Sequence, residues 1–166
     1  QWTFATVDAF YHNQNGLSAQ LNRLLKNQKD IGAAIVPVYG QAAGDKLTAL
    51  LTTHINQAVP VLTAAKSGDQ AALKKALDDW YANAQEIADF LASANSKNWK
   101  QEDLRAMMKL HIDETTGYAV ELLKGNYEEA VKKFDKANDD MKKMSDELAM
   151  GIVKQFPDKF KKTNKK

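Results

Sequence analysis

Apolar residues recur every three to four positions along almost the whole chain, which is the period of an α-helix with one buried face. No segment shows the alternation of apolar and polar residues that a half-buried strand needs. Turn-forming residues interrupt the pattern near Gly16, Gly40, Gly68 and Gly125. We therefore expect an all-α protein, an antiparallel bundle of about six helices arranged as three hairpins. By number, the expected helices cover 2–13, 17–37, 45–66, 70–92, 104–124 and 127–156, with 41–44 as a connector.

The last two hairpins repeat each other in sequence. His54-Ile55 lies 57 residues before His111-Ile112, and Gly68 lies the same distance before Gly125. The offset holds without a gap, which indicates that one helical hairpin was duplicated. We expect the two copies to form a four-helix bundle, against which the first hairpin packs.

Charge and length point to one domain with a basic end. The chain of 166 residues is long enough for a single domain, which we place at 1–157. Residues 158–166 carry five lysines and one aspartate, and we expect a flexible basic tail there that aids solubility or is attracted to an anionic envelope surface. Because the whole chain is +2 and this tail +4, the remainder is −2, which argues against nucleic-acid binding. No apolar run approaches the roughly 20 residues of a membrane span.

The amino terminus suggests where the protein acts. The sequence starts at Gln1 without methionine, so we expect a processed chain from which a secretion signal has been removed. Its partner would then be a small ligand or a component of the cell envelope. The absence of cysteine excludes disulfides and thiolate metal sites.

The two repeated histidines are the candidate site. His54 and His111 each precede a turn glycine by 14 residues, roughly 21 Å along their helices. Several polar residues of the return helices fall at the same level, so we expect a polar layer across the core. This layer would consist of His54, His111 and Asn138, with Tyr81, Asn83 or Asp140 added.

Three roles are open for this layer. The histidine nitrogens can be hydrogen-bonded by Asn, Thr or Tyr side chains and so specify the register of the helices, because buried polar groups need such partners. They can bind a divalent transition metal such as zinc, copper or iron, with His54, His111, Asn138 and Asp140 as ligands. They can also hold haem. Ferritin-type di-iron chemistry is disfavoured, because Leu51 and Met108 stand where that motif needs glutamate.

No motif of a nucleophile elbow, a phosphate loop or a dinucleotide site is present. We therefore expect a non-catalytic binding protein, with a metalloenzyme or haem protein as the alternative. Trp80 lies on an apolar stripe and should be core. The five methionines follow helical spacing, which favours adaptable core packing over a soft-metal site; they are Met107, Met108, Met141, Met144 and Met150.

The chain resembles a group of small, uncharacterised helical proteins of Gram-positive bacteria, some labelled glycosyltransferase without support. The resemblance spans nearly the whole chain and is carried by Trp2-Thr3, residues 24–32, Tyr39-Gly40, His54-Ile55, residues 80–84, Ile87-Ala88, Trp99, His111, Thr115-Thr116, Gly151-Ile152 and residues 155–160. Similar sequences often have histidine at the positions of Asn138 and Asp140. The resemblance implies a secreted helical bundle and no established activity, and six helices do not provide a nucleotide-sugar fold.

Overall fold

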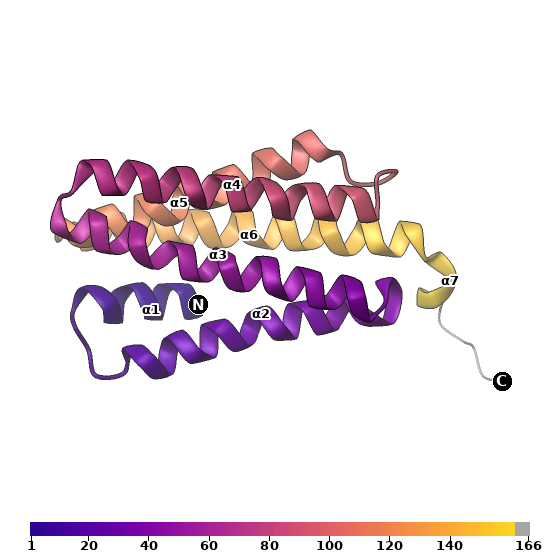
Figure 1. Cartoon of the computed structure of the whole chain (residues 1–166), viewed down its shortest axis with the longest axis horizontal. Helices are drawn as coiled ribbons and strands as arrows, with labels where there is room; N and C mark the ends of the chain where they lie inside the picture. The colour runs from indigo at the N-terminus through magenta and orange to yellow at the C-terminus, as the bar shows by residue number, and fades with distance from the viewer. Residues whose placement is uncertain (162–166) are drawn as a thin grey trace.

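The computed structural model describes residues 1–161, and in that range the chain forms seven α-helices and no strand (Figure 1). The prediction of an all-α bundle is confirmed. None of these helices combines the length and apolar character that crossing a membrane requires. The helices are α1 (Trp2–Tyr11), α2 (Leu17–Tyr39), α3 (Gln41–Ser67), α4 (Gln70–Ala94), α5 (Gln101–Leu123), α6 (Tyr127–Gln155) and α7 (Pro157–Phe160).

The five long helices run up and down, and each packs mainly against the next one in the chain. The shorter α1 packs on α2 and also reaches α5, and it extends along only one half of the bundle (Figure 1). Helix α6 makes its main contact with α5 alone. Part of the apolar surface of α6 therefore stays exposed, including Val131 and Met141.

The predicted connector at 41–44 is wrong, because a single residue joins α2 to α3. Gly40 has φ of 86°, a left-handed backbone conformation that lets the chain reverse at once, so α3 already begins at Gln41. Beyond this turn the two helices approach closely where glycines face each other. A Cβ atom added at Gly44 would lie 2.5 Å from Cγ2 of Val36 and 2.8 Å from the carbonyl oxygen of Gly32.

Replacing Gly44 by alanine should therefore destabilise the protein, although alanine favours helices. We expect the free energy of unfolding to fall by about 1–3 kcal/mol, the usual cost of overpacking, because the obstructing oxygen belongs to the backbone. Urea denaturation measures this. Gly117→Ala is the matched control: a Cβ there meets only the Lys133 side chain at 3.6 Å, so helix propensity should give no loss or a gain of up to about 1 kcal/mol. Equal effects of the two substitutions would contradict the close approach.

The core has two parts. The larger part lies among α3, α4 and α5 and is centred on Trp80, Ile87 and Ile112, which are at most 3% exposed. The smaller part lies where α1 covers the bundle, and there Tyr118 stacks on Phe4, which also packs edge-on against Phe134 of α6. Helix α1 thus closes one end of the bundle and bridges α5 and α6.

The predicted tail at 158–166 begins with ordered structure. Residues 157–160 form α7, and Nζ of Lys159 donates a hydrogen bond of 2.6 Å to the carbonyl oxygen of Pro37 in α2. This lysine also lies over the ring of Phe156. The remainder of the predicted tail, residues 162–166, lies outside the described residues.

Candidate functional site

The structure brings the two repeated histidines together. His54 of α3 and His111 of α5 have ring centroids 5.8 Å apart, with an angle of 27° between the ring planes. On another side of His54 lies the Trp80 indole of α4, at 5.2 Å. Three helices therefore contribute to one cluster of rings near the middle of the bundle.

His54 is held in one orientation by Asn83. Its Nδ1 lies 2.9 Å from Oδ1 of Asn83, while Nδ2 of the same amide donates to the carbonyl oxygen of Leu50 at 3.3 Å. Since the amide oxygen can only accept, Nδ1 of His54 carries the hydrogen and Nε2 keeps a free lone pair. A hydrogen bond of this kind behind an imidazole is what orients histidine ligands in metal sites.

Both imidazoles are uncharged at neutral pH. Burial lowers the pKa of His54 to about 4, against the opposing effect of the Asn83 hydrogen bond. Burial also lowers the pKa of His111 to about 4, and the nearby His54 adds to the shift. Their lone pairs are therefore available for a hydrogen-bond donor or a metal ion at pH 7.

These residues line a cavity of about 60 Å³, here called the histidine cavity. Most of its wall is apolar, from Val7 of α1 and Leu24 of α2 to Ala119 of α5. Four lining residues have a buried polar atom with no hydrogen-bond partner within residues 1–161. These atoms are Nε2 of His54, Nε1 of Trp80, Nδ1 of His111 and Oγ1 of Thr116.

The size of the cavity limits what it can hold. A single water needs about 10–15 Å³ on this scale, so the histidine cavity has room for a few waters, a small molecule or a metal ion with its remaining ligands. Pockets that take drug-sized ligands are at least about 300 Å³. A haem is larger still and does not fit between the two histidines in this conformation.

The remaining members of the predicted polar layer lie elsewhere. Tyr81 hydrogen-bonds Asp113 on the outside of the α4 and α5 pair. Asn138 is half-buried and lines neither the histidine cavity nor the second pocket described below. Asn138 therefore does not join the two histidines in a polar layer.

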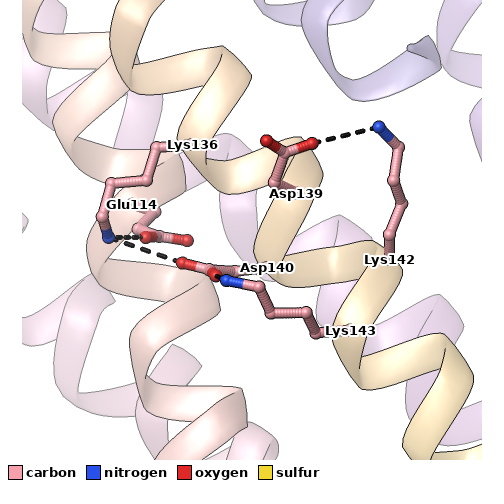
Figure 2. Close-up of polar contacts among 6 residues, drawn as sticks. All are labelled: Glu114, Lys136, Asp139, Asp140, Lys142 and Lys143. Carbon is pink, nitrogen blue, oxygen red and sulfur yellow. Dashed lines mark hydrogen bonds and ion pairs between the residues drawn. The ribbon is translucent and has the colours of Figure 1, made fainter.

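Asp140 belongs to an ionic cluster between α5 and α6 (Figure 2). Its carboxylate accepts a hydrogen bond of 2.6 Å from Lys143 and one of 3.5 Å from Lys136, which also binds Glu114. The hydrogen bond from Lys143, followed by one with the Glu114 carboxyl, holds the pKa of Asp140 below its usual value. Asp140 is thus engaged with lysines and does not line the histidine cavity.

The predicted four-residue metal set is consequently divided in space. Within residues 1–161, no three His, Asp or Glu side chains are grouped closely enough to hold a metal ion. A metal in the histidine cavity would have two protein ligands, His54 and His111. The other predicted donors, Asn138 and Asp140, are not beside it.

The second pocket lies between α5 and α6 and has a volume of about 140 Å³. His111 lines it as well as the histidine cavity, so this one side chain separates the two spaces. We call it the methionine pocket, because three of its nine lining residues are methionines. The lining residues are Met107, Leu110, His111, Glu114, Asp140, Met141, Lys143, Met144 and Glu147.

Thr116 is a cavity residue that the sequence did not single out for chemistry. It is five positions after His111 on α5, a spacing that does not place two residues on one helical stripe. The only signal for it was its place in Thr115-Thr116, among the residues that carry the resemblance. No known protein family, characterised protein or solved structure matches this chain.

Proposed function

We propose that this chain is a non-catalytic binding protein whose ligand occupies the histidine cavity. The observation that carries the proposal is the set of four unpartnered polar atoms in the wall of one small, otherwise apolar space. Folded proteins rarely leave such atoms unsatisfied, because each costs about 1–3 kcal/mol of desolvation. A bound ligand that hydrogen-bonds or coordinates them removes that cost.

Two ligand classes suit the cavity. A transition metal ion such as zinc, copper or iron can bind the lone pairs of His54 and His111, and the Asn83 hydrogen bond supports this by fixing the tautomer of His54. A small molecule of a few heavy atoms can accept from Trp80 and donate to His54. Both ligand classes use His54, so substitution of this residue tests both.

The low pKa of the two histidines favours a binding role over a catalytic one. A general acid or base works best with a pKa near the working pH, whereas burial holds the pKa of both histidines at about 4. Export to the cell envelope is part of the proposal and is supported by the resemblance. The metalloenzyme alternative has no additional support from the cavity.

Zinc titration tests the metal class. We expect calorimetry to show one saturable site in the wild type, and a loss of most of the affinity in His54→Ala and in His111→Ala, because each removes one of two ligands. His12→Ala is the matched control, since His12 is exposed at the end of α1 and does not line the cavity. Circular dichroism checks that the variants remain folded.

Protein purified from its native host tests the small-molecule class. Native mass spectrometry, elemental analysis and a visible spectrum should reveal one bound ion or small molecule that His54→Ala no longer retains. If the host protein carries neither, and zinc binds wild type and both variants equally weakly, the proposal is wrong. The histidine cavity is then a water-filled part of the core.

A further inference from the structure

Beyond the histidine cavity, the methionine pocket gathers four soft metal donors from two neighbouring helices. Met107 and His111 are four residues apart on α5, and Met141 and Met144 are three residues apart on α6. Side chains at these spacings share one face of a helix. Since α5 and α6 pack against each other and all four residues line one pocket, the two faces meet.

We propose that the methionine pocket is a site for a soft monovalent metal ion, Cu(I), held by the sulfurs of Met107, Met141 and Met144 and by Nε2 of His111. Thioether sulfur selects Cu(I) over divalent metals, and imidazole accommodates it. Pairs of donors on facing helices of a bundle are a common way to build a metal site. The site needs neither cysteine nor a carboxylate ligand.

The placement of the methionines suits this role better than packing alone. Met144 is buried, but Met141 is 39% exposed although it lines the pocket. A methionine side chain has three rotatable bonds, so each sulfur can be repositioned by changes of rotamer. The pocket volume of about 140 Å³ leaves room for that rearrangement.

The charges around the pocket attract a cation, and most of its carboxylates are already paired with lysines. Its lining includes three carboxylates, Glu114, Asp140 and Glu147, and one ammonium group, Lys143. Lys136 adds a further positive charge at Glu114 and Asp140, which leaves an excess of one negative charge. Two of the carboxylates are engaged with lysines (Figure 2), so they do not favour magnesium or zinc.

Silver ion, Ag(I), is the air-stable probe for this site. The protein with ¹³C-labelled methionine methyl groups should give five signals, one for each methionine. Titration with Ag(I) in chloride-free buffer should give one saturable site and shift the signals of Met107, Met141 and Met144. The signals of Met108, in the core, and Met150, outside the pocket, should stay unchanged.

Substitutions by leucine remove the sulfur and nearly conserve volume. Met141→Leu and Met144→Leu should each weaken Ag(I) binding by roughly tenfold or more, since even groups that only orient a ligand matter at that level. Met150→Leu is the matched control and should bind as the wild type does. If Met144→Leu fails to fold, Met141→Leu still decides, because its side chain is partly exposed. Competition with a chromophoric Cu(I) chelator under reducing, oxygen-free conditions then gives the affinity for copper.

Three results would overturn the proposal. They are the absence of a saturable Ag(I) site, binding that survives both pocket substitutions, and a shift of the Met150 signal as large as those of the pocket methionines. His54→Ala separates this site from the histidine cavity, because His54 does not line the methionine pocket. That variant should keep its Ag(I) affinity while losing zinc. Loss of both metals in His54→Ala, with the fold intact, would mean that there is one site and not two.

Discussion

Replacing Trp80 by alanine should lower the free energy of unfolding by about 3–5 kcal/mol, the range of large aromatic truncations in protein cores. Trp80 is 3% exposed and lies in the larger part of the core, in contact with His54. Its removal would extend the histidine cavity, which the bundle can refill only by shifting helices. Urea unfolding followed by circular dichroism measures the loss.

Trp2→Ala provides the comparison for this result. Trp2 begins α1 and is 43% exposed. The Arg23 guanidinium lies over its ring as a cation–π pair, with 5.5 Å between the guanidinium carbon and the ring centroid. Exposed pairs of this kind contribute about 0.5–1 kcal/mol, so its loss should stay near that value. If Trp80→Ala cost no more than Trp2→Ala, the central placement of Trp80 would be wrong.

The helical period was sufficient to predict an all-α bundle, because each long helix buries a stripe against its neighbour. It also identified Trp80 as core and His54 and His111 as residues at a common level. A pattern of period 3.6 reports which residues share a face, and turn glycines report where the chain reverses. The position of a residue along the helix axis, counted from the turn, follows directly from the helical period and the turn glycines.

The direction in which a residue points around its helix axis is harder to infer. The errors in the predicted site concern this direction. Asn138 lies on the stripe from Phe134 to Met141, which suggested an inward direction. The stripe of α6 is wider than its contact with α5, however, and Met141 remains 39% exposed. The sequence does not show which part of the α6 surface stays exposed to solvent. It therefore cannot distinguish a buried position on α6 from one at the border of the exposed surface.

The cavities were beyond sequence analysis for a related reason. A cavity is what remains when side chains from several helices fail to fill a space, and the histidine cavity has walls from five of them. Thr116 and Trp80 acquire a polar role only through this shared wall.

The duplication of the hairpin stays a prediction, and the two copies now differ in one respect. Asn83 binds His54, whereas Asp140, at the corresponding distance from its turn glycine, binds lysines.

Acid should destabilise the protein in a window set by His54, which is buried, and by the half-buried His111. Unfolded histidine has a pKa near 6.5, whereas the pKa of His54 and of His111 in the folded state is about 4. Above about pH 6.5 both states are uncharged at these sites, so they leave stability unchanged. Between about pH 6.5 and 4 only the unfolded state takes up the protons, and stability falls as the pH falls. Each histidine should cost roughly 3 kcal/mol by pH 4, a large share of a typical domain's stability.

Carboxylates act in a different range, which keeps the histidine window separate. Partners lower the pKa of Asp89, Asp113 and Glu121 in the folded state, to about 2 for Glu121. Groups of this kind stabilise the protein above the unfolded pKa near 4, and that contribution is lost as the pH falls through their lower folded values. Loss of stability between pH 6.5 and 4.5 should therefore come from the histidines.

His111→Leu isolates one half of the acid effect. Its buried Nδ1 has no partner within residues 1–161, so leucine leaves no hydrogen bond broken there, and stability at pH 7 should be equal or higher. Between pH 6.5 and 4.5 this variant should lose about half as much stability as the wild type, as measured by urea unfolding at several pH values. His12→Leu, at the exposed end of α1, should retain the full loss. Because a bound ion would also occupy His111, the measurement needs metal-free protein, and parallel curves for wild type and His111→Leu would show that His111 is not buried uncharged.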